Sequence, residues 1–218
     1  MASKPILYSY FRSSASWRVR IVLAMKGIDY EYRAVNLIKD GGMQKTEEFK
    51  AMNPMGQVPV FVVGDVALSQ SMAIIDYLED LYPIPSINPK DPIKKAQARA
   101  LAELVTSGIQ PIQNLSVLQK VSESQEGRAE WARFWIDKGF RAYEELVQRT
   151  AGKYSVGDEV TIADVCLVPQ LYNANRFNVD MSRFPTITRI IVELSKLDAF
   201  KAAAPEVQPD TPEELKAK

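Results

Sequence analysis

Apolar residues in the first 82 positions alternate between short β-branched runs and helical spacings. Residues 6–10 are β-branched and aromatic, which predicts a strand, and a polar cluster follows at residues 12–16. The next apolar positions have helical spacing and stop at Gly27, a residue typical of the position just past a helix end. The chain is therefore expected to open with a strand, a polar loop and a helix.

Three more strand patterns and two more helices complete this region. Residues 30–35 predict a strand and residues 46–52 a short helix. Two apolar runs flank Gly64-Asp65, a glycine-led connection of two residues that favours an antiparallel β-hairpin. An amphipathic helix is expected from residue 72 to about residue 82. The order βαβαββα predicts an α+β, thioredoxin-like domain at residues 1–83.

Only helical patterns follow this domain. Four prolines within ten positions, Pro83, Pro85, Pro89 and Pro92, predict an interdomain linker at residues 84–91. Asp91 and Pro92 are typical of a helix start. Residues 92–218 are therefore predicted as an all-α domain, in which Thr161 and Asp164 form a structural capping box. The tail from residue 205 is polar and contains prolines, so we expect it to pack loosely and to carry no functional residue.

Composition narrows the classes of function. With 27 basic and 27 acidic residues, the chain has no excess positive charge for nucleic acid or an anionic membrane, and no apolar run approaches the roughly 18 residues of a membrane span. The sequence contains no histidine, which excludes histidine-based zinc sites and Ser-His-Asp triads. The single cysteine, Cys166, cannot form an internal disulfide. We expect a cytoplasmic protein without a metal.

Three features of the first domain could carry chemistry together. The run Ser13-Ser14-Ala15-Ser16 opens a helix, where free amides and the helix dipole favour an anion such as a thiolate. Val58-Pro59 lies where a thioredoxin-like domain has a cis-proline, and Gln70-Ser71 opens a later helix that could bind a carboxylate. Each feature alone has a simpler explanation, since serine is a leading helix cap.

The sequence resembles the zeta-class glutathione transferases along nearly its whole length. The matching blocks are YSYFRSS at 8–14, NLIKDGG at 36–42, NPMGQVP at 53–59, QS at 70–71, GIQPIQNLS at 108–116 and GDEVTIAD at 157–164. The resemblance implies the glutathione transferase fold, glutathione as cofactor and a homodimer. It also implies isomerisation of maleylacetoacetate to fumarylacetoacetate, a step of tyrosine and phenylalanine catabolism, with transferase activity toward small α-halo acids.

The same resemblance assigns residues. Ser13, with Ser14 beside it, is implied to be catalytic, and its hydroxyl donates a hydrogen bond to the glutathione sulfur. A small acidic substrate is implied to bind Arg176. The implied glutathione-binding residues are Ser13, Ser14, Ala15, Ser16, Trp17, Arg18, Gln44, Val58, Gln70, Ser71, Gln110, Asn114, Leu115 and Ser116.

One position departs from the family pattern. The family motif usually reads Ser-Ser-Cys, and the third place here is Ala15. This difference argues against chemistry that needs that cysteine, such as thiol exchange. Two alternatives remain from the sequence: a non-catalytic module that uses this scaffold for protein assembly, and a redox enzyme of the thioredoxin or omega type, which would need a cysteine at the first helix.

Overall fold

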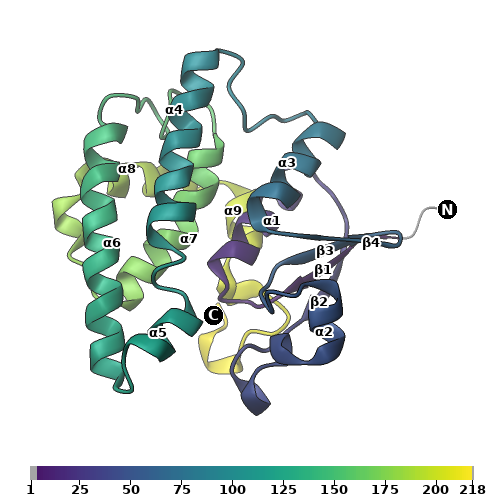
Figure 1. Ribbon diagram of the computed structural model, residues 1–218. Coiled ribbons are helices and arrows are strands. Elements are labelled where there is room, and N and C mark those ends of the chain that lie inside the picture. Colours follow the sequence, from purple (N-terminus) through teal and green to yellow (C-terminus); the bar gives the residue numbers. More distant parts are fainter. Residues whose placement is uncertain (1–3, 218) are drawn as a thin grey trace. The chain divides into compact units, whose positions relative to one another are not determined.

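The computed structural model describes residues 4–217, which form two compact units (Figure 1). The first unit joins Met1–Pro85 to Asp198–Lys218, and the second is Ser86–Leu197. The predicted all-α domain began at residue 92 and ran to the C-terminus. The structure differs, because the last stretch of the chain packs with the N-terminal sheet and its helices.

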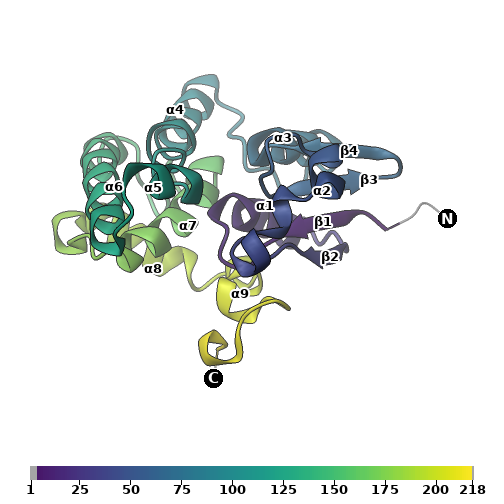
Figure 2. The ribbon, with the colours of Figure 1, turned by 60° about the horizontal axis from the view of Figure 1, so that its bottom comes forward.

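A four-stranded mixed sheet forms the centre of the first unit. The strand order is β2-β1-β3-β4; β1 and β2 are parallel, and the other two pairs are antiparallel. The helices α1 and α3 pack against each other (Figures 1 and 2). This order confirms the predicted thioredoxin-like fold. The elements are β1 (Ile6–Ser9), α1 (Ser14–Met25), β2 (Glu31–Ala34), α2 (Glu47–Met52), β3 (Val60–Val63), β4 (Val66–Ser69) and α3 (Ser71–Leu81).

Local sequence explains the connections in this unit. Val63 pairs with Val66 across Gly64, whose φ of 58° is in the left-handed region that favours glycine, so the predicted hairpin is confirmed. The helix α1 begins at its cap Ser13 and ends just before Gly27, as its apolar spacing predicted. Leu7, Val19 and Phe61 are fully or almost fully buried and belong to the core.

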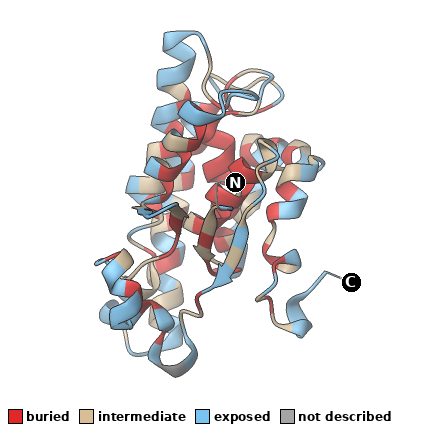
Figure 3. Cartoon of the chain, turned by 90° about the vertical axis from the view of Figure 1, so that its right-hand side faces the viewer, coloured by how far each residue is buried: buried red, intermediate tan, exposed pale blue. Residues whose placement is uncertain are grey.

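The C-terminal segment is ordered, contrary to the expectation of loose packing. The helix α9 (Asp198–Ala203) packs against α1, and buried residues recur through residues 203–211, at Ala203, Pro205, Gln208 and Thr211. Buried stretches are also seen near the C-terminus in Figure 3. Gln208 is buried, and its Nε2 donates to the carbonyl oxygens of Ala202 at 3.0 Å and Ala204 at 2.8 Å. Side-chain hydrogen bonds of this kind help to order a segment whose sequence has no apolar periodicity.

The second unit is helical throughout its described elements. The helix α4 packs on α7, and α6 packs on α5 and α8. Among the described residues, none of the helices combines the length and apolar character needed to cross a membrane. The elements are α4 (Pro92–Glu103), a π-helix (Leu104–Ile109), α5 (Leu115–Val121), α6 (Gln125–Val147), α7 (Ile162–Arg176), a 3₁₀ turn (Met181–Arg183) and α8 (Pro185–Leu194).

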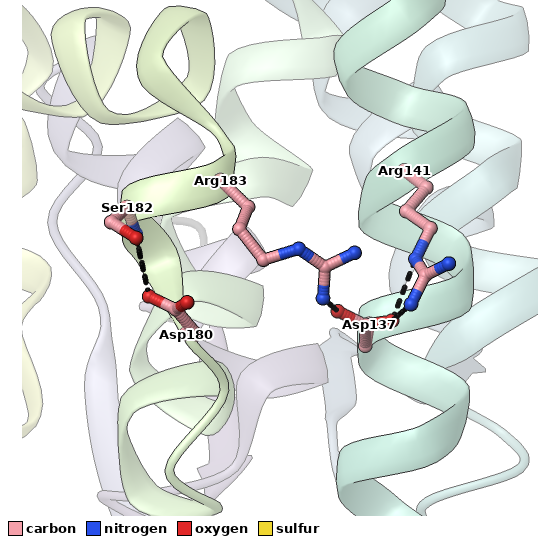
Figure 4. Close-up of polar contacts among 5 residues, drawn as sticks. All are labelled: Asp137, Arg141, Asp180, Ser182 and Arg183. Atoms are coloured by element: carbon pink, nitrogen blue, oxygen red, sulfur yellow. Dashed lines mark hydrogen bonds and ion pairs between the residues drawn. The ribbon is translucent and has the colours of Figure 1, made fainter.

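An ion-pair cluster links α6 to the short turn before α8 (Figure 4). The Asp137 carboxylate binds Arg141 one turn along the same helix, with the closest oxygen and nitrogen 2.6 Å apart. Its other oxygen lies 2.6 Å from Nη1 of Arg183. Both arginine side chains are more than two-fifths exposed, so each pair adds little stability.

Candidate active site

The sheet register brings the three candidate segments of the first unit to one edge. Tyr8 and Ser69 both pair with Val60 from opposite sides. The end of β1, the start of β3 and the end of β4 therefore lie side by side. Ser13 follows the end of β1, Val58 precedes the start of β3, and Gln70 follows the end of β4.

Ser13 is the N-cap of α1. Its backbone is extended, with φ −67° and ψ 115°, and its Oγ accepts a hydrogen bond from the Ser16 amide at 3.2 Å. Because that bond uses a lone pair, the hydroxyl hydrogen of Ser13 is left to donate to another group. Ser13 is half-buried, so its hydroxyl can reach a ligand.

The first turn of α1 suits an anion. The first amides of a helix lack intrahelical carbonyl partners, and the helix dipole places partial positive charge there. Ser16 gives its amide to Ser13, which leaves the amides of Ser14 and Ala15 for a ligand. No acidic side chain lies in this turn to oppose a negative charge.

Arg18 and Ser71 join α1 to α3. Arg18 is 2% exposed, and its Nη1 donates to Oγ of Ser71 at 3.3 Å. The buried guanidinium places positive charge beside the first residue of α3. A helix N-terminus and an arginine together favour a carboxylate ligand.

Val58 precedes a cis-proline, as predicted. The Val58-Pro59 peptide bond is cis, and Val58 packs in one buried cluster with Tyr10 and Phe11. The chain that approaches Ser13 thus contacts the chain that enters β3.

Gln70 has an uncommon backbone conformation for a residue with a side chain. Its φ is 70° and its ψ is 115°, and it is the N-cap of α3 without a capping bond from its side chain. Such strain persists where the surroundings impose it, and it concentrates at ligand sites. The Gln70 side-chain amide is not used to cap the helix that it begins.

Because the family resemblance assigns glutathione binding to Gln70, we expect Gln70→Ala to raise the KM for glutathione roughly 10-fold or more, since a hydrogen bond to a charged group contributes about 1.5–3 kcal/mol. The kcat should change little. Gln70→Gly should have the same KM for glutathione as Gln70→Ala. Its melting temperature should be higher than that of Gln70→Ala, because glycine adopts positive φ without strain. Gln125→Ala, at an exposed glutamine that begins α6, is the matched control. Unchanged KM in both Gln70 variants would remove this residue from the site.

Gln44 lies in a 3₁₀ turn, Met43–Lys45, and is buried. Its Nε2 donates to the Leu37 carbonyl oxygen at 3.2 Å, so the side chain helps to hold the loop between β2 and α2. Gly42 has a φ of 101°, and a Cβ there would lie 2.5 Å from Gln44 Oε1, which explains the glycine. The predicted contact of Gln44 with glutathione stays a prediction.

The remaining candidates belong to the second unit. Gln110 follows the π-helix, and Asn114 is the N-cap of α5, where its Oδ1 accepts from the Leu115 amide at 2.7 Å. Ser116 is in the first turn of α5. Arg176 ends α7, is exposed, and holds its guanidinium 4.9 Å from the centre of the Phe177 ring. The roles predicted for these residues stay predictions.

Sequence reasoning missed two residues, Arg20 and Asp210, which bind the chain just before Ser13. Arg20 is 1% exposed and donates to the Phe11 carbonyl oxygen at 2.8 Å, while Asp210 accepts from the Phe11 amide at 3.0 Å. One signal was available for Arg20, because it interrupts the apolar stripe of the first helix. Asp210 lies in a polar tail without any pattern of its own.

Known proteins share this architecture. The family model described as "Glutathione S-transferase, N-terminal domain" matches residues 3–80. The maleylacetoacetate isomerase of Mus musculus is 58% identical over 215 residues, which cover 99% of each chain.

Solved structures agree with the sequence relatives. A bacterial maleyl pyruvate isomerase of the zeta class has a TM-score of 0.91 at 41% identity, covering 95% of this chain and 100% of the other. The maleylacetoacetate isomerase of Anaeromyxobacter dehalogenans 2CP-1, solved with glutathione in its active site, has a TM-score of 0.88 at 46% identity, covering 97% and 100%. Another structure of that enzyme holds dicarboxyethyl glutathione and citrate. The chain described here belongs to the zeta class of the glutathione transferases, together with the maleylacetoacetate isomerases.

Proposed function

We propose that this protein catalyses the glutathione-dependent cis–trans isomerisation of maleylacetoacetate to fumarylacetoacetate, and that it also transfers glutathione to small α-halo acids. The single observation that carries this proposal is the Ser13 hydroxyl, which caps α1 through its oxygen and keeps its hydrogen for a ligand. The names of relatives with 56–58% identity over almost the full chain support the isomerase activity.

The residues at the sheet edge fit glutathione, a tripeptide with two carboxylates and a thiol. Bound glutathione supplies a sulfur nucleophile that adds to the cis double bond; after rotation about the resulting single bond, elimination of the same thiolate re-forms the double bond in the trans isomer and regenerates glutathione. Ser13 Oγ donates to the sulfur, and the amides of Ser14 and Ala15 stabilise negative charge beside it. Gln70 and Ser71 bind a carboxylate of the tripeptide at the start of α3.

The hydrogen bond from Ser13 and the N-terminus of α1 together supply enough free energy to lower the pKa of the glutathione thiol. A thiol pKa near 8.5 must fall by about two units for ionisation at neutral pH, which requires about 2.7 kcal/mol. A hydrogen bond to a charged group contributes about 1.5–3 kcal/mol, and a helix N-terminus adds about 0.3–1 kcal/mol. A serine at a helix start can therefore ionise the thiol, and no histidine is needed.

The alternatives have weaker support. Relatives and structural neighbours that carry isomerase names favour an enzyme over a non-catalytic module. Thiol–disulfide chemistry would need a cysteine at the first helix, where this chain has Ala15, and Cys166 is completely buried.

We also infer the finer assignments from the family resemblance. The protein works as a homodimer in the cytoplasm, on an acidic substrate of tyrosine and phenylalanine catabolism. Its balanced charge, with 27 basic and 27 acidic residues, offers no attraction to nucleic acid or to an anionic membrane.

A direct assay tests the activity. Maleylacetoacetate is incubated with the protein, with and without glutathione, and the formation of fumarylacetoacetate is followed. We expect turnover only with glutathione, and glutathione should not be consumed. Retention on immobilised glutathione without any isomerisation would support the non-catalytic module instead.

Arg176 is proposed to bind a carboxylate of the substrate. Arg176→Ala should raise the KM for the acidic substrate roughly 10-fold, as expected for a lost hydrogen bond to a charged group, and leave the KM for glutathione unchanged. Arg149→Ala, at another exposed arginine of the second unit, should change neither value. If the two variants change the KM for the acidic substrate equally, Arg176 has no specific role in substrate binding.

A further inference from the structure

The C-terminal segment contacts the turn that leads to Ser13. The amide of Ser13 donates to the Tyr10 carbonyl oxygen at 2.9 Å, which closes a four-residue turn with Phe11 and Arg12 at its centre. The Phe11 amide donates to Oδ2 of Asp210 at 3.0 Å, although the two residues are 199 positions apart. The tail thus binds a central peptide group of this turn.

Arg20 holds the same turn through its carbonyl groups. Its Nη2 donates to the Phe11 oxygen at 2.8 Å, and its Nη1 lies 3.4 Å from the Tyr10 oxygen that also receives the Ser13 amide. Its Nε donates to the Ala203 carbonyl oxygen at 3.1 Å, at the end of α9. The guanidinium is 1% exposed, so these bonds form away from water.

Asp210 is itself fixed by a second bond. Its Oδ1 accepts from the Tyr32 hydroxyl at 2.6 Å, on β2. Burial and the hydrogen bond to Asp210 raise the pKa of Tyr32, so the phenol keeps its proton and donates. One carboxylate therefore connects β2 to the turn before Ser13.

Neighbouring tail residues keep Asp210 in place. Gln208 binds the carbonyl oxygens of Ala202 and Ala204, and the Thr211 hydroxyl donates to the Pro205 carbonyl oxygen. Gln208 and Thr211 are about 95% buried. The chain on either side of Asp210 is therefore held by hydrogen bonds from buried side chains.

We infer that Asp210 is a positioning residue for the glutathione site, which holds the Tyr10–Ser13 turn so that the Ser13 hydroxyl meets the glutathione sulfur. The inference rests on the proposed role of Ser13 and extends it to the far end of the chain. A misplacement of about 1 Å can cost on the order of 100-fold in rate, so a turn held at both its amide and its carbonyl groups matters for turnover.

The test replaces the carboxylate by an amide of nearly the same shape. In Asp210→Asn, the Nδ2 group can only donate, whereas both oxygens of Asp210 accept. The variant therefore cannot accept from the Phe11 amide and from the Tyr32 hydroxyl at the same time. We expect kcat at neutral pH to fall roughly 10-fold, within the range for such misplacements, and the pKa of the bound glutathione thiol to rise by about one unit. The KM for glutathione should change less than about twofold, because Gln70 and Ser71 remain.

Two readouts separate positioning from simple stability. The ultraviolet absorbance of the bound thiolate, followed against pH with glutathione alone, reports its pKa without any isomerisation. Hydrogen exchange at the Phe11 amide should accelerate in the variant. Asp198→Asn is the matched control, since Asp198 is fully exposed on α9 and should leave both values as in the wild type.

Asp210→Glu keeps the charge and both acceptors, displaced by one methylene. Its kcat and bound-thiol pKa should lie between those of the wild type and Asp210→Asn. If Asp210→Asn yields no folded protein, Asp210→Glu alone carries the test through its difference from the wild type.

The outcomes are distinct. A variant at position 210 with a lower melting temperature but an unchanged kcat and thiol pKa overturns this inference and leaves the proposed function intact. A wild-type protein that binds glutathione without lowering its thiol pKa contradicts the role of Ser13 and overturns this inference with it.

Discussion

Replacing Ser13 by alanine should lower kcat/KM for isomerisation by roughly 10- to 150-fold, and the protein should remain folded. The variant loses the hydroxyl that we propose donates to the glutathione sulfur, and a hydrogen bond to a charged group contributes about 1.5–3 kcal/mol. It also loses the acceptor for the Ser16 amide, which costs about 1 kcal/mol of stability. Steady-state kinetics against pH, circular dichroism and thermal unfolding measure the two losses separately.

Ser124 offers a matched control for the stability effect. It caps α6 in the same way, with its Oγ accepting from the Gly127 amide at 3.0 Å. Ser124→Ala should therefore lose a similar amount of stability, about 1 kcal/mol, without any loss of turnover. Turnover in Ser13→Ala equal to that of Ser124→Ala would reject Ser13 as the partner of the thiolate.

The largest expected loss of stability comes from Asp164→Ala. Asp164 is completely buried, and its carboxylate accepts from the Thr161 amide at 2.7 Å, the Thr161 hydroxyl at 3.0 Å and the Ser155 amide at 2.9 Å. Burial raises the pKa of Asp164, and these hydrogen bonds oppose the rise. Alanine leaves the buried donors without an acceptor, so we expect the free energy of unfolding to fall by about 3–5 kcal/mol.

Asp91 provides the comparison. It caps α4 at an exposed position, where its Oδ1 accepts from the Lys94 amide at 2.8 Å, so Asp91→Ala should cost only about 1 kcal/mol. Urea unfolding of the two variants gives the difference. Similar losses for both would mean that the buried bonds of Asp164 contribute no more than an ordinary exposed cap.

Local patterns predicted most of the first unit. The strand at residues 30–35 is β2 at Glu31–Ala34, and the short helix at 46–52 is α2 at Glu47–Met52. The capping box of α7 is also confirmed, since Asp164 receives the Thr161 amide. These elements were predictable because turn residues, caps and apolar periodicity act within a few positions of each other.

The second unit was less predictable. Pro111 by itself favours a kink or a new helix start, and the structure has a π-helix at Leu104–Ile109 just before it. Such a turn has no distinct apolar period, because an extra residue is accommodated within an otherwise helical stripe. Its sequence therefore resembles that of any buried helix.

By itself, the sequence determined the thioredoxin-like order of the first unit, the family and the serine at the start of α1, because strand runs, helix caps and motif blocks are local features. Only the tertiary structure decided that residues 198–217 belong with that unit, and that Asp210 binds the turn before Ser13. Its bonds join it to Tyr32 and Phe11, 178 and 199 positions away. Hydrogen bonds over such distances leave no periodic pattern in a polar tail.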